Sequence, residues 1–313
     1  MLIADSFCAM MTRKNLWRQI MTDHRPLRRS RLMMVTAMTV FGTIALFVRN
    51  IPIPSAEIAL YRALMATLLL GGSFLVTGRK IDFHAIRKEL PLLLFSGVAV
   101  GFNWILLFEA YRYTTVSVAT LSYYFAPVLV TVACPILFRE KMGLKQWLCF
   151  LMSTLGIVLI TGIGDLGGSD THLTGILFGL SAAVLYATAV LLNKYIRGVA
   201  GMQRTFLQFV AASVVLLPYV LLTGGVHLGD LSGTGWVNLL VVGVVHTGLA
   251  YTLYFSSLKD ISGQETAILS YIDPLVAVGV SVFVLGEQLT LLQLTGGLLI
   301  LGFTLYNEIK TEN

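Results

Sequence analysis

Long apolar runs separated by short polar breaks occupy most of this 313-residue chain. A helix that crosses a bilayer needs roughly 20 apolar residues, because its length must match the hydrocarbon core. Ten runs fall in that range, at residues 32–48, 56–77, 90–111, 115–138, 144–162, 172–193, 205–222, 236–257, 264–285 and 291–307. These runs are too long for the strands of a membrane barrel, and polar and apolar residues do not alternate within them. Helices must therefore satisfy the backbone N–H and C=O groups within the lipid. The sequence predicts an all-α membrane protein with ten transmembrane helices.

The composition excludes the common soluble classes. Charged residues make up only 12% of the chain and hydrophobic residues 56%. Soluble domains carry about 25% charged residues, so a soluble fold of this size could not cover its surface with so few. A soluble dehydrogenase, kinase or DNA-binding domain is therefore excluded.

The basic residues indicate how the chain crosses the membrane. Nineteen of the 22 Lys and Arg residues lie in the amino-terminal tail, the even-numbered connections or the carboxyl tail. The positive-inside rule then places both termini in the cytoplasm of a multi-pass protein of the cell membrane. The net charge of +6 is explained by these basic residues of the connections and tails. We therefore do not expect nucleic acid as a partner. Residues 1–31 are polar and basic, and we expect a disordered cytoplasmic tail there.

The two halves of the chain share residues at one fixed offset. An offset of 147 pairs seven identical residues: Gly101/Gly248, Phe108/Phe255, Tyr124/Tyr271, Pro127/Pro274, Glu140/Glu287, Leu144/Leu291 and Gln146/Gln293. We expect one five-helix repeat at 32–163 and a second at 172–309. Since five is an odd number, the second repeat must enter the membrane in inverted orientation, an architecture typical of secondary transporters.

A proline lies in the fourth span of each repeat, and a charged turn follows that span. The first repeat has Ala126-Pro127-Val128, then Arg139-Glu140-Lys141 with Gln146 and Gly156; the second has Asp273-Pro274-Leu275, then Gly286-Glu287 with Gln293 and Gly296. In these features the chain resembles the drug/metabolite transporter superfamily, and within it the EamA-type exporters, from about residue 32 to 307. The resemblance implies export of small metabolites, often amino acids or amines, or of drugs.

The chain is interpreted as a secondary transporter and not an enzyme. The sequence contains no phosphate loop, metal cluster or nucleophile–base arrangement, so no catalytic residue, metal or cofactor is predicted. Export of a small molecule by alternating access is expected, with protons as a candidate coupling ion. An importer of a quaternary amine such as choline is the alternative, and a membrane-embedded enzyme is less favoured. The oligomeric state stays open between monomer and homodimer.

Asp273 is the first candidate for binding or coupling. It lies about nine residues into the ninth span, and ionisable groups at that depth are costly enough to be functional hypotheses by default. Pro274 removes a backbone donor and frees carbonyls nearby. The carboxyl could bind a proton or an amine, or it could be hydrogen-bonded within the bundle. His246, in the eighth span, could share a proton with Asp273 or be a neutral, satisfied histidine.

A polar cluster at the start of the second span gives a further candidate. Tyr61 lies four residues after Glu57 and shares its helix face. Arg62 could bind a substrate carboxylate through its planar guanidinium. It could also pair with Glu57 or Glu109 as a structural brace, which we favour slightly.

Aromatic and amide side chains within the spans could line a cavity. The candidates are Trp104, Tyr124, Tyr186, Tyr251 and Tyr271, with Asn103 as a polar group. A cation would favour the faces of such rings. For any single ring, packing is the simpler explanation. Glycine pairs such as Gly97/Gly101 and Gly175/Gly179 fit close helix packing, which we expect within one chain.

Overall fold

The computed structural model describes residues 27–78, 83–138, 143–161, 170–196, 198–199, 201–258 and 260–309. Residues 1–26, which hold most of the predicted tail, and the first charged turn at 139–142 lie outside these ranges. The first helical segment begins at Leu27, earlier than the predicted start at residue 32.

Helices account for all the regular structure of the described residues, which confirms the all-α prediction. The first segment, Leu27–Val48, ends in α2 (Ile44–Val48) and is followed by α3 (Ser55–Thr77), α4 (Phe83–Tyr113), α5 (Val116–Tyr123), α6 (Ala126–Phe138) and α7 (Leu144–Thr161). The remaining elements are α8 (Asp170–Tyr195), α9 (Gly201–Thr223), η1 (Leu228–Asp230), α10 (Gly233–Leu240), η2 (Val241–Leu249), α11 (Ala250–Ser257), α12 (Gly263–Ser270), α13 (Ile272–Gly279), η3 (Val280–Val284) and α14 (Leu291–Glu308). Helices occupy most of the described residues of each predicted run.

The outer faces of the helices are apolar. In the described part of the chain, seven helices are long and apolar enough to cross a membrane, and Leu144–Ile160 and Ile268–Val284 are shorter apolar helices. Large side chains such as Leu68, Phe95 and Leu298 are 65–74% exposed. Soluble monomers rarely expose extensive apolar surface, so these faces fit contact with lipid.

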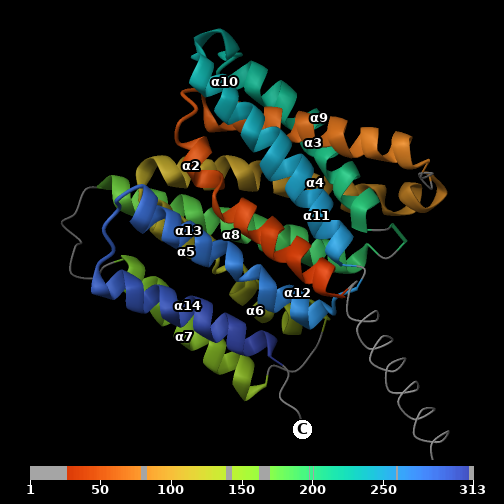
Figure 1. The fold of residues 1–313 in the computed structure, drawn as a ribbon. Helices are drawn as coiled ribbons and strands as arrows, with labels where there is room; N and C mark the ends of the chain where they lie inside the picture. The colour runs from red at the N-terminus through yellow and green to blue at the C-terminus, as the bar shows by residue number, and fades with distance from the viewer. Residues whose placement is uncertain are drawn as a thin grey trace, which may run out of the picture.

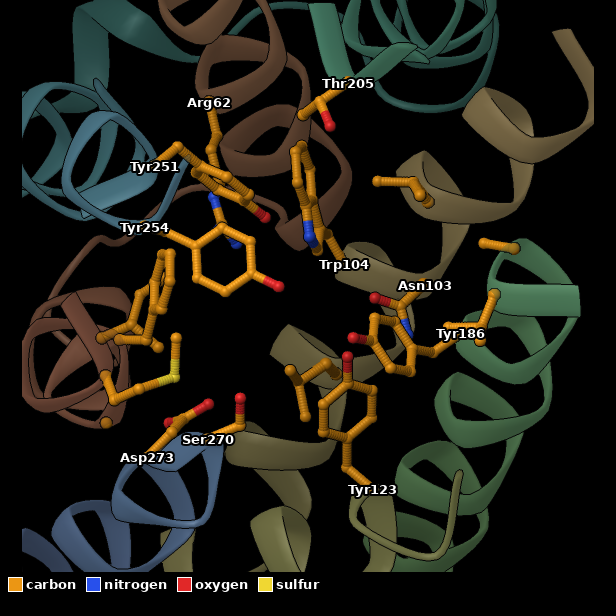
Figure 2. Close-up of a pocket in the computed structure, with 18 of the residues that line it drawn as sticks. Arg62, Asn103, Trp104, Tyr123, Tyr186, Thr205, Tyr251, Tyr254, Ser270 and Asp273 are labelled. Atoms are coloured by element: carbon orange, nitrogen blue, oxygen red, sulfur yellow. The ribbon is translucent and has the colours of Figure 1, made fainter. Parts of the chain in front are cut away.

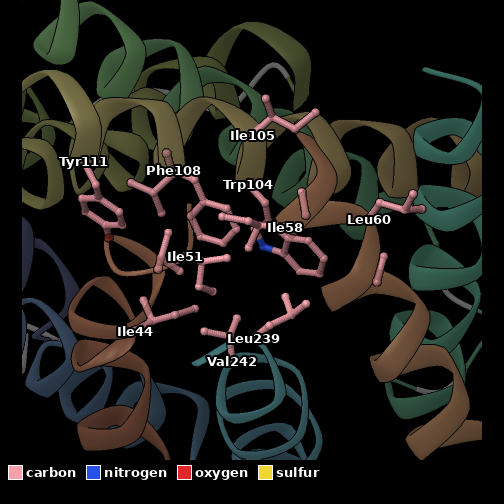
Figure 3. Close-up of a cluster of buried hydrophobic side chains, with 14 of the residues drawn as sticks. Ile44, Ile51, Ile58, Leu60, Trp104, Ile105, Phe108, Tyr111, Leu239 and Val242 are labelled. Atoms are coloured by element: carbon pink, nitrogen blue, oxygen red, sulfur yellow. The ribbon is translucent and has the colours of Figure 1, made fainter. Parts of the chain in front are cut away.

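Two groups of helices have the most extensive packing in the bundle (Figure 1). In one, α4 packs against α8 and α9, and α3 packs against α9 and η2. The other is the pair α7 and α14, which lie side by side at one edge. Close to α10, a core cluster of buried apolar side chains that includes Ile44, Ile58, Phe108 and Val242 joins α2, α3, α4 and η2 (Figure 3).

The fourth span of each predicted repeat is broken beside its proline. A turn at Tyr124 separates α5 from α6, which contains Pro127. A turn at Tyr271 likewise separates α12 from α13, which contains Pro274. Proline lacks the N–H that would continue the hydrogen-bond ladder, so the helix yields at this position. The breaks agree with the loosening predicted from Pro274.

The predicted fifth span of each repeat begins with the same type of cap. In α14, Gln293 accepts from the Thr290 backbone N–H at 3.1 Å, and the Thr290 side chain accepts from Gln293 N. At the start of α7, Gln146 accepts from the Gly143 N–H at 2.5 Å. Such caps satisfy backbone groups that a helix start leaves free. The glutamine of the sequence motif therefore fixes where each helix begins.

Small residues bring helices of this chain into close contact, as predicted. A Cβ added to Gly97 would lie 2.6 Å from the carbonyl oxygen of Gln208 on α9. One added to Gly175 would lie 2.6 Å from the Thr114 side chain. Both glycine contacts are made within one chain, so these residues are explained without a dimer interface.

Candidate functional site

A central cavity of about 340 Å³ lies between the helices of both halves. Its wall includes side chains from the first helical segment and from α3, α4, α5, α8, α9, α11, α12 and α13. Seven of the nine candidate residues line it: Arg62, Asn103, Trp104, Tyr124, Tyr186, Tyr251 and Asp273. The broken spans and the helix packing thus bring together side chains that are far apart in the sequence (Figure 2).

Asp273 lies at the start of α13, directly after the turn that breaks the ninth predicted span. The Tyr124 hydroxyl donates to its Oδ2 at 2.6 Å, and this contact joins the two predicted repeats. Gly42 packs against the same turn, where an added Cβ would lie 2.5 Å from the Asp273 carbonyl oxygen. Tyr124 therefore holds the carboxylate, and the first helical segment packs against the backbone of Asp273, while the side chain lines the cavity.

Arg62 does not form the predicted brace. Glu57 instead accepts from the Tyr61 hydroxyl at 2.8 Å and from the His227 backbone N–H at 2.9 Å. Glu109 pairs with Arg112 at 3.4 Å. The i,i+4 spacing of Glu57 and Tyr61 is matched by a hydrogen bond, and the turn at His227, 170 residues away, binds the same carboxylate.

The Arg62 guanidinium is buried beside aromatic rings. The residue is 5% exposed, and its Nε donates to Thr247 Oγ1 at 3.1 Å. The guanidinium carbon lies 4.2 Å from the centroid of the Trp104 ring, which is cation–π geometry. Among the described residues Arg62 takes part in no ion pair.

His246 and Tyr271 lie outside the wall of the central cavity. His246 is 1% exposed on η2, a π-helical segment; its Nε2 is 3.0 Å from Thr43 Oγ1 and its Nδ1 is 3.2 Å from the Val241 carbonyl oxygen. Both ring nitrogens thus have partners other than Asp273. Tyr271 lines a second cavity of about 210 Å³, whose wall shares Tyr124 and Asp273 with the first.

The candidate rings and Asn103 have different surroundings. The Tyr186 ring packs against Tyr123 with centroids 5.5 Å apart, and Tyr251 packs against Phe41 at 5.1 Å. Asn103 lines the cavity but donates to the Ala182 carbonyl oxygen at 2.6 Å, which joins α4 to α8.

Three polar residues of α9 that were not predicted line the cavity: Arg204, Thr205 and Gln208. Gln208 donates to Ser96 Oγ at 2.8 Å and to Asn193 Oδ1 at 2.7 Å. Arg204 donates to the carbonyl oxygens of Asn193 and Ile196 at 3.2 Å each. Residues 204 and 208 are four apart and share one helix face, which was the signal available in the sequence.

A polar network at one end of the bundle joins helices that are distant in the sequence. Glu287 pairs with Arg49, accepts from the Val116 backbone N–H at 2.8 Å, and accepts from the Ser281 hydroxyl. These four residues form the Glu287 network, and the end of the bundle that they occupy is the Glu287 end. The network ties the first helical segment and the start of α5 to the turn before α14.

Comparisons with known proteins agree with this architecture. The model of the EamA-like transporter family matches residues 29–162 and again 173–307. An uncharacterized transporter, YxxF, of Bacillus subtilis is 32% identical over 267 residues, which cover 84% of each chain. A probable amino-acid metabolite efflux pump of Salmonella typhimurium is 27% identical over 251 residues, covering 76% of this chain and 84% of the relative.

A solved crystal structure shares the fold. It has a TM-score of 0.61 and 19% sequence identity, and covers 88% of this chain and 94% of its own. The family and the names of the relatives indicate a multi-pass membrane transporter rather than an enzyme. The two family matches, which together span most of the sequence, show that this chain belongs to the EamA-like transporter family.

Proposed function

We propose that the protein is a secondary transporter that exports small metabolites, amino acids or amines among them, across the cytoplasmic membrane. The observation that carries the proposal is the central cavity, in which polar and aromatic side chains are enclosed by helices with apolar outer faces. Buried polar groups are costly in such a bundle unless they serve a ligand or each other. The efflux-pump name of one relative supports the outward direction.

Alternating access between two inverted five-helix repeats is the proposed mechanism. Ten crossings would place the Glu287 end at the outer face and the end of α14 in the cytoplasm. The cavity wall extends to Arg204, Tyr254 and Phe255, near the end of the bundle opposite the Glu287 network. Substrate would enter from that side, and the network would separate when the repeats exchange conformations. The repeat-related turns at Tyr124 and Tyr271 support this symmetry.

Asp273→Asn is expected to lower the rate of transport about tenfold or more and to remove its pH dependence. The reason is that the amide keeps an acceptor for Tyr124 but can neither take up a proton nor bind an ammonium group as an anion. The measurement is efflux of labelled amino acids from proteoliposomes at several values of internal pH. Asp230→Asn, at an exposed position in η1, is the matched control. Unchanged flux with unchanged pH dependence in Asp273→Asn would exclude Asp273 from coupling.

Uptake of a quaternary amine is the second candidate, because Asp273 and several tyrosines line one cavity. Choline offered to the same proteoliposomes separates the two candidates. A permanent cation that is transported while amino acids are not would favour the amine carrier.

A further inference from the structure

Arg62 is a buried cation without an acidic partner in the described residues. Removing a charge from water is costly unless another charge or a set of hydrogen bonds compensates it. Thr247 and the Trp104 ring compensate Arg62 in part. In Figure 2 the Arg62 side chain extends toward the rings of Tyr251 and Tyr254. A guanidinium in this position suits a bidentate anionic group such as a carboxylate.

Asp273 lies on the opposite side of the same cavity (Figure 2). No other aspartate or glutamate of the described residues lines this cavity. Arg62 and Asp273 both line this space but form no ion pair with each other. Arg204, the second arginine in the wall, donates to backbone carbonyls. Arg62 and Asp273 therefore face each other across a gap, while two backbone carbonyls hold Arg204 at the wall.

The space between these charges has aromatic walls. Phe41, Tyr186, Tyr251 and Tyr254 line the cavity together with Trp104. Its volume of about 340 Å³ is at the lower end of the range for small-molecule sites, roughly 300–1,000 Å³. A small ligand with a large apolar or aromatic group would cover these rings.

We propose that the central cavity binds zwitterionic amino acids, with the carboxylate on Arg62, the ammonium group at Asp273 and a large apolar side chain against the aromatic walls. This assignment rests on the proposed function for its role in transport, while the binding geometry stands on the cavity itself. A simple cation would leave Arg62 unpaired beside it, and a simple anion would leave Asp273 unpaired. A zwitterion neutralises both charges.

The test compares four ligands. Three of them share a phenyl group and differ in charge, and the fourth is a permanent cation without a ring. Phenylalanine, phenethylamine, 3-phenylpropionate and choline are titrated into the purified full-length protein, and affinity is measured by calorimetry. Phenylalanine is expected to bind about tenfold or more tightly than phenethylamine or 3-phenylpropionate, because each analogue leaves one buried charge unpaired. Equal affinity of phenylalanine and phenethylamine, or no binding of phenylalanine, would overturn the proposal.

Arg62→Gln gives an internal control, since the ratio of two affinities does not depend on the fraction of folded protein. The ratio of phenylalanine to phenethylamine affinity is expected to fall to about one, while Arg112→Gln, at an exposed pair, leaves it unchanged. Asp273→Asn should remove the preference over 3-phenylpropionate in the same way. An equal loss of both affinities in Arg62→Gln would show a structural role and overturn the assignment.

Transport assays separate this inference from the proposed function. If phenylalanine binds as expected but does not cross proteoliposome membranes, the binding site stands and the transporter proposal fails. If choline is transported and zwitterions neither bind nor cross, the transporter stands and the zwitterion site fails.

Discussion

Replacing Glu287 with glutamine is expected to make the central cavity accessible from the Glu287 end. The carboxylate pairs with Arg49 and also accepts from Val116 N and from the Ser281 hydroxyl, so one side chain joins three segments of the chain. Glutamine keeps one acceptor oxygen but loses the charge that holds Arg49. Hydrogen bonds to charged groups contribute about 1.5–3 kcal/mol. Loss of one such interaction would shift a two-state equilibrium by about tenfold to a hundredfold.

The measurement is the rate at which a membrane-impermeant thiol reagent modifies a cysteine in the cavity. Thr120 lines the cavity and is 3% exposed, so Thr120→Cys reports access in a background with Cys8, Cys134 and Cys149 replaced by alanine. Reagent added outside intact cells should react about tenfold faster in the Glu287→Gln variant.

Glu109→Gln is the matched control for this experiment. Glu109 and Arg112 form an ion pair within α4, so its loss separates no helices. An equal increase in both variants would indicate general loosening of the fold. No increase in Glu287→Gln would show that the network does not hold this end closed.

Gly156→Ala is expected to destabilise the pair α7 and α14. An added Cβ would lie 2.6 Å from the Gly296 carbonyl oxygen and 2.8 Å from Ile300 Cγ1. The obstacle is backbone, which cannot rotate away, so the two helices must separate. Overpacking of this kind typically costs about 1–3 kcal/mol and occasionally more. A lower midpoint of thermal unfolding in detergent, with a smaller fraction of monodisperse protein, is the expected result.

Gly302→Ala provides the comparison within α14. An added Cβ there would meet no atom within 4 Å. Alanine favours a helix over glycine by about 1 kcal/mol, so this variant should be as stable as the wild type or slightly more so. A Gly156→Ala protein that unfolds at the same temperature as Gly302→Ala would contradict the tight crossing.

The helices and much of the cavity wall could be predicted from the sequence. The length of an apolar run depends on that segment alone, and most of the described residues of each predicted run are helical. Asp273 could be identified as a candidate because burying a carboxylate deep in an apolar run is costly, which indicates a functional role. These predictions use local composition and the general cost of burying charge, both of which are visible in one chain.

The side-chain partners on other helices could not be predicted, because they depend on which helices become neighbours. Glu57 shares its helix with Arg62, yet its partner His227 comes from a turn in the other half. His246 contacts Thr43 only because the first segment packs against η2, and its contact with the Val241 carbonyl lies within η2 itself. Spacing in the sequence places residues on one face of a helix but does not say what that face meets.

The π-helical segment Val241–Leu249 determines which way the cavity side chains that follow it in the sequence point. Its wider turns are visible in the bond from Thr247 Oγ1 to the carbonyl of Val242, five residues earlier. Because an α-helix has 3.6 residues per turn, inserting or deleting one residue rotates the side chains that follow it by about 100° around the helix axis. The directions of Tyr251 and Tyr254, which follow this segment, are therefore set by the number of residues before them as well as by their identity. A relative that lacks one residue here could keep both tyrosines and still present a different surface to its substrate.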